Sequence, residues 1–89
     1  MVPLISALFT DPAARDFDNI IQRLSLNGRD VAFDFYGTTI QVVELLKNNP
    51  FSGKAGRVTG TREFAIPKYS FSLIYSHHGG SLVIIAILE

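Results

Sequence analysis

The sequence predicts an α+β fold, in which an α-helical hairpin packs on one face of a small antiparallel β-sheet. Three observations lead to this prediction: one short apolar segment opens the chain, two segments of helical periodicity follow, and three strand-like segments come last. In the resulting order, β-α-α-β-β-β, the two helices can bury their apolar stripes against the sheet. A chain of 89 residues that is 47% hydrophobic is expected to form a single domain, residues 1–89, around one dense core.

The first half of the chain contains the opening strand and the first helix. Residues 4–9 are predominantly apolar and predict the strand. Thr10 or Asp11 can cap a helix, and the proline that follows them suits the first helical turn. Apolar residues then recur at helical spacing until Gly28, where a glycine typical of helix ends predicts the stop.

A second helix is predicted over residues 30–47. Gly37 and the two threonines that follow it are weak helix formers, so a break or kink is allowed at that point. Pro50 ends the helical segment, because proline cannot continue it. The residues expected on the buried stripe are Ala32, Phe35, Tyr36, Val42, Val43 and Leu46.

The second half is predicted as three strands and their connections. The strands cover residues 57–66, 69–75 and 81–88, with turns at 67–68 and 77–80. The last strand is apolar at every position from Leu82 to Leu88, on both of its faces, and two helices can cover only one face. Neighbouring Tyr and Phe side chains, a partner protein or a second copy of the chain are therefore expected to cover the other face.

Composition excludes several classes of protein. The net charge is zero, which argues against binding to nucleic acid through bulk positive charge. The charge is nevertheless uneven: residues 1–46 carry a balance of −3 and residues 47–68 a balance of +4, which indicates two different surfaces. The absence of cysteine excludes disulfides, cysteine-based zinc sites and a thiol nucleophile.

No cofactor, metal or membrane segment is expected. Gly53 and Lys54 lack the spacing of a phosphate-binding loop, and His77 and His78 would point to opposite faces of a strand. The longest apolar run is far shorter than the roughly 20 residues that span a bilayer. Because the N-terminus also lacks a basic region followed by a long apolar one, we expect a cytoplasmic domain.

Residues 49–63, NPFSGKAGRVTGTRE, join the second predicted helix to the next strand. This segment resembles the RelE/ParE superfamily of bacterial toxins, in which a helical hairpin ends in NP and is followed by a GR…GR loop and then by GTRE or GSRE. Lys54 stands at the first arginine of that pattern, and residues 57–63 match the remainder without a gap. Residues 69–75 and 83–88 resemble the later strands of the family, so the likeness covers nearly the whole chain. It favours the ParE-like branch, also called plasmid stabilisation proteins.

The resemblance implies the toxin half of a type II toxin–antitoxin module. ParE-like toxins act on DNA gyrase by binding it, so the expected partners are gyrase and a cognate antitoxin that lays a helix or strand over the hydrophobic surface of the toxin. An acidic antitoxin would also complement the basic segment 47–68. The residues expected to contact the target or the antitoxin are Lys54, Arg57, Arg62, Leu82, Ile84, Ile85 and Ile87.

The alternative within the superfamily is RelE-like cleavage of messenger RNA on the ribosome. Such cleavage needs a base, an acid and cations at the phosphate, and the candidates are Arg62, Glu63, Tyr75 and His77. RelE-like nucleases carry an arginine directly after the aromatic residue of the third strand, where this chain has Ser72, so this interpretation comes second. The sequence has no tail beyond the last strand like that of other family members, which leaves a non-toxic, antitoxin-binding relative as the third expectation.

Overall fold

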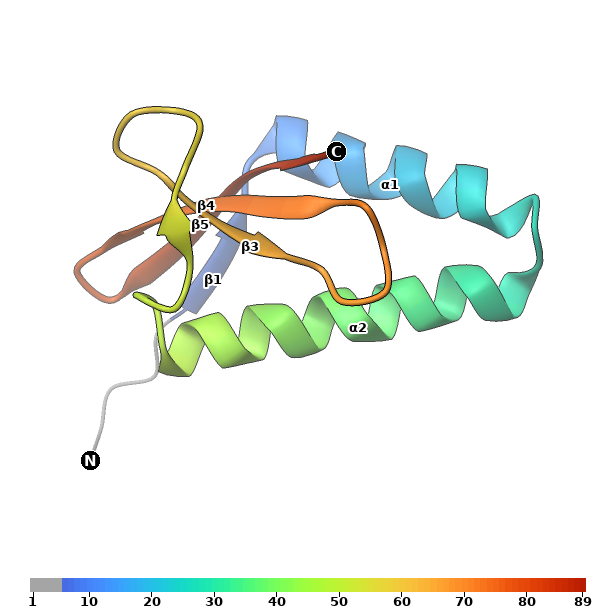
Figure 1. Ribbon diagram of the computed structural model, residues 1–89, viewed down its shortest axis with the longest axis horizontal. Coiled ribbons are helices and arrows are strands. Elements are labelled where there is room, and N and C mark those ends of the chain that lie inside the picture. Colours follow the sequence, from blue (N-terminus) through green and yellow to red (C-terminus); the bar gives the residue numbers. More distant parts are fainter. Residues whose placement is uncertain (1–5) are drawn as a thin grey trace.

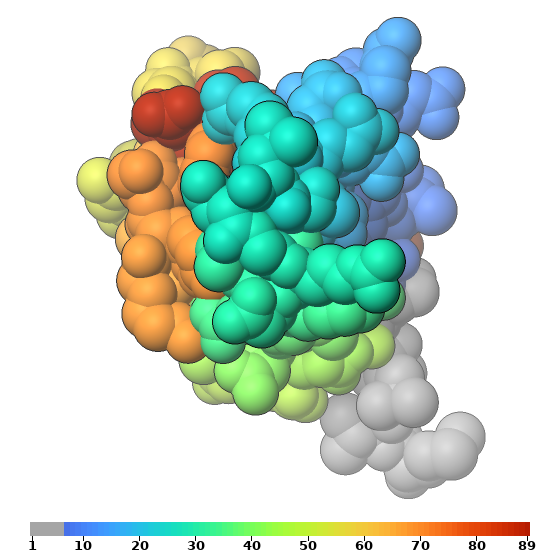
Figure 2. All heavy atoms as spheres, turned by 90° about the vertical axis from the view of Figure 1, so that its right-hand side faces the viewer, coloured from blue at the N-terminus to red at the C-terminus, as the bar shows by residue number. Residues whose placement is uncertain are grey.

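The computed structural model describes residues 6–89 and confirms the predicted α+β class (Figure 1). Its elements are β1 (Ser6–Phe9), α1 (Asp11–Ser25), α2 (Arg29–Asn48), β2 (Lys54–Ala55), β3 (Arg62–Ala65), β4 (Ser72–His78) and β5 (Ser81–Leu88). Residues 4 and 5 of the predicted opening strand lie outside the described residues. The two helices form an antiparallel hairpin along the sheet, and the turn between β3 and β4, orange in Figure 2, lies beside them.

The five strands lie in the order β1-β5-β4-β3-β2. The pairs β3–β4 and β4–β5 are antiparallel as predicted. The short strand β2, which was not predicted, pairs antiparallel with β3, and β1 pairs with β5 in parallel, which makes the sheet mixed. A parallel pair requires a crossover connection, and here the helical hairpin forms the first part of it. The first described strand, β1, therefore lies at the edge of the sheet next to the last strand, β5.

A β-bulge in β5 is bonded to the start of α1. Tyr75 pairs with Ile84 and the preceding residue of β4 with Ala86, so Ile85 is the extra residue. Thr10 caps α1 by accepting a hydrogen bond from the Ala13 amide at 3.2 Å, and its hydroxyl donates to the Ile85 carbonyl at 3.0 Å. The predicted cap at Thr10 is thus confirmed, and it also satisfies a backbone group freed by the bulge.

The bulge determines which side chains of β5 enter the core. Strict alternation would place Ile84 and Ile87 on opposite faces, but the extra residue between them turns both toward the helices. The core lies between the sheet and the helical hairpin, and aromatic contacts link its layers, for example Phe17 with Phe35 and Phe9. Its fully buried side chains include Phe35, Leu46, Leu73, Tyr75, Leu82 and Ile84.

Several predicted boundaries were wrong. Helix α2 is continuous through Gly37, because the buried stripe on both sides of this exposed residue outweighs its weak propensity. The strand predicted over 57–66 begins only at Arg62, because Gly60 adopts a positive φ of 82° in a tight turn. The strand predicted over 69–75 instead starts at Ser72 and runs to His78, so both histidines belong to β4.

Thr39 is the basis of a stability prediction. Its side chain is fully buried in α2, and its hydroxyl has no hydrogen-bond partner within the described residues. A buried hydroxyl without a partner is destabilising, so Thr39→Val is expected to raise the free energy of unfolding by about 1 kcal/mol, measured by chemical denaturation. The control Thr38→Val, at a position that lines a surface groove, is expected to change it less. Equal or lower stability of Thr39→Val would contradict this account.

Candidate functional site

The polar residues of the GTRE segment are organised around Glu63. This carboxylate is only 5% exposed and accepts hydrogen bonds from Arg57 Nε at 2.7 Å and from the Arg57 backbone amide at 2.8 Å. A second guanidinium nitrogen, Nη1, donates to the Glu89 carbonyl at 3.0 Å. Arg57 therefore reaches from β3 to the end of β5 over the sheet face that the helices leave free. Ile74, which lies in register between Glu63 and Ala86, is buried there.

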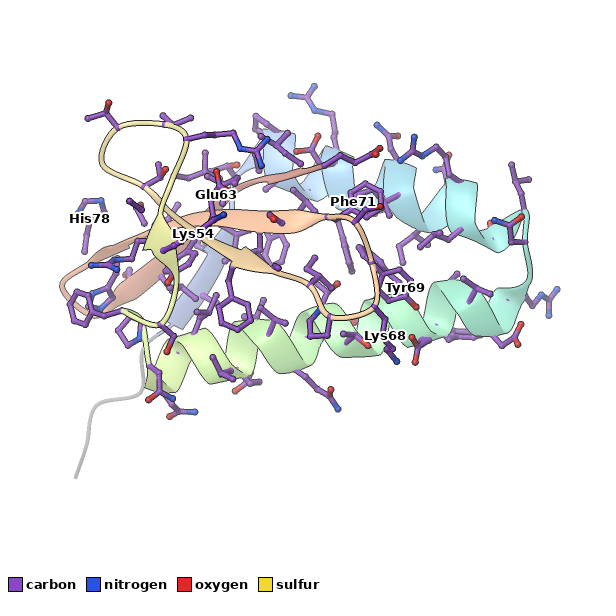
Figure 3. All side chains as sticks on the ribbon, viewed as in Figure 1. Lys54, Glu63, Lys68, Tyr69, Phe71 and His78 are labelled. Carbon is purple, nitrogen blue, oxygen red and sulfur yellow. The ribbon has the colours of Figure 1, made fainter. Side chains whose placement is uncertain are left out.

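This arrangement fixes the charge of the pair. Hydrogen bonds from the Arg57 side chain and, to a lesser extent, from the Arg57 backbone amide hold the pKa of Glu63 below its ordinary value. The side-chain hydrogen bond in turn raises the pKa of Arg57. Lys54, on the neighbouring strand β2, is the register partner of Glu63 and lies beside it (Figure 3). Glu63 is thus the buried anion that organises the loop before β3, and Lys54 remains exposed.

Arg62 and Tyr75 hold the segment that follows α2. The Tyr75 hydroxyl donates to the Pro50 carbonyl at 2.7 Å and accepts from the Gly53 amide at 3.0 Å. Arg62 Nη1 donates to the Gly53 carbonyl at 3.0 Å, and the guanidinium lies 5.0 Å from the centre of the Phe51 ring. Glycine is required at position 53, because a Cβ there would lie 2.6 Å from the Tyr75 hydroxyl.

The two histidines occupy opposite faces of β4. His77 is half-buried and packs edge-on against Phe51 at 5.6 Å, and its Nε2 has no hydrogen-bond partner within residues 6–89. His78 is exposed and points away from the rest of the molecule in Figure 3. The described part of the chain contains no cluster of three or more histidine, aspartate or glutamate side chains that could hold a metal ion. No helix in it is both long and apolar enough to cross a membrane.

The four predicted nuclease residues do not all share one site. Arg62, Tyr75 and His77 lie on one face of the sheet around the segment 50–53, whereas Glu63, the residue after Arg62, faces the other side. The Tyr75 hydroxyl is occupied by two hydrogen bonds, and Glu63 is occupied by Arg57. Their positions are those of structural residues that shape loops.

The prediction for the last strand needs correction. Leu82, Ile84 and Ile87 were expected to contact a partner, but they lie in the core beneath the helices and have no accessible surface of consequence. Ile85 is half-buried at the bulge. The free face of β5 is less bare than its sequence indicates, because Arg57 shields its C-terminal half. Alternation alone could not reveal the bulge that produces this arrangement.

An exposed apolar surface lies instead between the helices. Ile21 and Ser25 of α1 and Arg29, Ala32, Phe33 and Tyr36 of α2 line an open groove of about 460 Å³, at the closed end of the hairpin seen in Figure 2. Phe33 is 73% exposed, and Tyr36 is half exposed although it was predicted to be buried. The signal was present in the sequence: Phe33, Tyr36 and Ile40 recur at helical spacing beside the buried stripe. We call the groove lined by Ile21, Ser25, Arg29, Ala32, Phe33 and Tyr36 the hairpin groove.

A second polar cluster fastens the β3–β4 turn to α2. Asp34 accepts hydrogen bonds from the Tyr69 hydroxyl and from Lys68, whose side chains reach toward α2 in Figure 3. The bond from Tyr69, and then that from Lys68, lowers the pKa of Asp34. The same bond to the carboxylate raises the pKa of Tyr69 to about 12. The sequence carries no local signal of this contact, because Asp34 and Tyr69 are 35 positions apart.

The Glu63 site predicts a specific pH dependence. A carboxylate with a lowered folded-state pKa contributes stability above its unfolded pKa, near 4.5, and this contribution is lost as the pH falls through the folded value. Glu63→Gln is therefore expected to be less stable than the parent at pH 7 and to approach it in acid, as measured by urea unfolding across this pH range. Glu44→Gln, at an exposed site on α2, is the control and should show a much smaller difference. A Glu63→Gln deficit that is independent of pH would contradict the assignment.

Tyr75→Phe tests the anchoring of the segment 50–53. Removing the hydroxyl leaves the Pro50 carbonyl and the buried Gly53 amide without their partner, which should destabilise the fold by about 1–3 kcal/mol. Amide hydrogen exchange at Gly53 should accelerate by more than the global change requires. Tyr36→Phe, with a half-exposed ring, is the control and should stay within about 0.5 kcal/mol of the parent. Unchanged stability and exchange in Tyr75→Phe would show that the hydroxyl does not anchor the loop.

Comparisons with known proteins agree with this fold. The family described as the ParE toxin of type II toxin-antitoxin system, parDE, matches residues 7–89. A solved structure of the chromosomal ParDE TA system from P. aeruginosa is similar with a TM-score of 0.85 and 23% sequence identity, over 99% of this chain and 98% of that one. No curated protein sequence matches the chain. The family match over nearly its whole length, together with the shared fold, establishes that the chain belongs to the ParE toxin family of type II toxin–antitoxin systems.

Proposed function

We propose that this ParE-type toxin inhibits DNA gyrase by binding it, without turnover, and that its cognate antitoxin neutralises it by placing an amphipathic helix in the hairpin groove. The ParE-like resemblance of residues 49–63 supports gyrase as the target, and the family match is consistent with it. The proposal places the protein in the cytoplasm, together with gyrase.

The hairpin groove is the observation that carries the antitoxin contact. Its exposed lining surface is mainly apolar, and its lining residues Phe33 and Tyr36 are exposed to solvent in the free protein. A groove between two helices accepts the apolar face of a third helix through anchors spaced three or four residues apart. Arg29 at the same groove would pair with a carboxylate on that helix, in agreement with an acidic antitoxin.

Binding without catalysis is supported by the state of the polar residues. Of the candidate acid–base groups, Tyr75 and Glu63 are held in hydrogen bonds that maintain the fold. The Arg62 guanidinium is committed to the carbonyl of Gly53 and to the ring of Phe51. General acid–base catalysis requires such groups to reach the reacting atoms, which Tyr75, Glu63 and Arg62 cannot do without releasing a loop. This leaves His77, which packs against Phe51, as the one candidate whose ring nitrogen has no partner within residues 6–89.

Controlled expression of the chain in bacteria tests the cellular function. Filamentation with an induced DNA-damage response is expected, because a blocked gyrase interrupts DNA replication. Protein synthesis should continue at first, as measured by amino-acid incorporation. A prompt stop of protein synthesis with cleaved messenger RNA would contradict the proposal and support the ribonuclease interpretation. Normal growth in the presence of folded protein would leave only antitoxin binding.

Phe33→Asp tests the antitoxin contact separately. A carboxylate in the apolar groove should weaken antitoxin binding roughly a hundredfold or more, because a buried charge without a partner is strongly unfavourable. Calorimetric titration with the antitoxin should show this loss, and the antitoxin should no longer rescue growth. Val58→Asp, at an exposed apolar position in the loop before β3, is the control and should bind as the parent does. Equal affinity of Phe33→Asp and the parent would exclude the groove as the antitoxin site.

A further inference from the structure

We infer that Phe51 is the anchor through which this toxin contacts its target, on a surface separate from the hairpin groove, and that the complementary surface on gyrase is an apolar pocket with an acidic rim. The inference rests on the proposed function, because it takes gyrase as the target. It begins from an aromatic ring that the fold holds firmly and yet leaves in solvent.

Phe51 is 69% exposed and lies in the segment after α2, which ends at Asn48. Its backbone is fixed on both sides, since the Tyr75 hydroxyl binds Pro50 and Gly53, and Arg62 Nη1 lies 3.4 Å from the Phe51 carbonyl. An exposed ring in a mobile loop would lose conformational entropy on binding. Here the ordering has already taken place during folding, which favours affinity for a partner.

The Phe51 ring is also oriented by its neighbours. The Arg62 guanidinium lies 5.0 Å from the ring centre, and the His77 ring meets it edge-on at 5.6 Å. Phe51 stays mostly exposed with both contacts in place. Aromatic residues, including phenylalanine, and arginine are both enriched at protein interfaces.

The charge around Phe51 determines the chemistry of the partner. The Arg62 guanidinium lies against the ring. Glu63, the next residue of β3, faces the other side of the sheet, where it pairs with Arg57 and lies in register with Lys54. The charged side chain in contact with the anchor is therefore a cation, and a partner with an apolar pocket for the ring and acidic residues at its rim would be complementary to it.

Phe51 and the hairpin groove are well separated. Phe33 lies near the start of α2, whereas Phe51 follows its last residue, and the helix rise places these two positions more than about 20 Å apart. Substitutions at one surface can therefore be made without disturbing the other.

A supercoiling assay with purified DNA gyrase tests the inference. Phe51→Ala is expected to raise the half-inhibitory concentration at least about tenfold, the effect of losing an anchoring aromatic. Leu8→Ala, which removes a side chain of similar exposure (64%) from β1, is the matched control and should inhibit as the parent does. Parent-like inhibition by Phe51→Ala would overturn the inference.

Two further results separate the possible causes of failure. If the parent chain itself does not inhibit gyrase, the proposed function fails and this inference fails with it, whereas an active parent with an equally active Phe51→Ala overturns the inference alone. To distinguish loss of contact from loss of fold, Phe51 can be replaced by the photoreactive p-benzoylphenylalanine, with position 8 as the control site. Cross-linking to gyrase from position 51 and not from position 8 supports the inference, and the reverse pattern overturns it.

Discussion

The backbone of β5 leaves its regular pairing at Ile85, and the rest of the fold depends on how β1 and α1 supply the missing hydrogen bonds. The Thr10 hydroxyl donates to the Ile85 carbonyl, and an Asp16 carboxylate oxygen accepts from the Ile87 amide at 3.0 Å. Each bond joins residues more than 70 positions apart in the chain. Without them, buried backbone groups next to the core would lack partners, which is strongly unfavourable. The same bonds fix where α1 begins and therefore how the helical hairpin lies on the sheet.

On the opposite side of the molecule, the sheet is completed by side chains that reach across it. Arg57 joins Glu63 to the end of β5, and Tyr75 joins β4 to the segment that follows α2. These residues belong to the motifs that give the chain its resemblance to toxins, yet their contacts are structural. The residues of the motif hold Phe51 and the adjacent Arg62 guanidinium in fixed positions. The two surfaces proposed to bind partners, the hairpin groove and Phe51, consist of residues other than Arg57, Glu63 and Tyr75.

The order of elements could be predicted from the sequence because it depends on local signals. The cap at Thr10, the stop at Pro50 and the helical periodicity between them each act within a few residues. The parallel pairing of β1 with β5 and the bulge at Ile85 could not be predicted, because they arise from contacts across almost the whole chain. For the same reason Ile87 was expected to contact a partner, although it lies in the core.

The candidate site was less predictable than the fold. Tyr36 was expected on the buried stripe but is half exposed, and Phe33 and Phe51 are exposed as well, whereas the nuclease candidate Tyr75 is fully buried. Burial depends on how a helix is rotated against its neighbours, and α2 carries apolar residues on more than one side. The charged residues Arg57 and Arg62 were identified correctly as belonging to a loop–strand junction, but their partners lie in other elements, and these the sequence does not reveal.

The central claim is that this toxin acts by occupying its target, and the stoichiometry of gyrase inhibition tests it most directly. Gyrase held well above the dissociation constant should lose supercoiling activity in proportion to added toxin, with complete inhibition at about one toxin per binding site. The addition of antitoxin should restore activity in the same proportion. Complete and irreversible loss of activity at a small fraction of that ratio would indicate turnover and contradict the account.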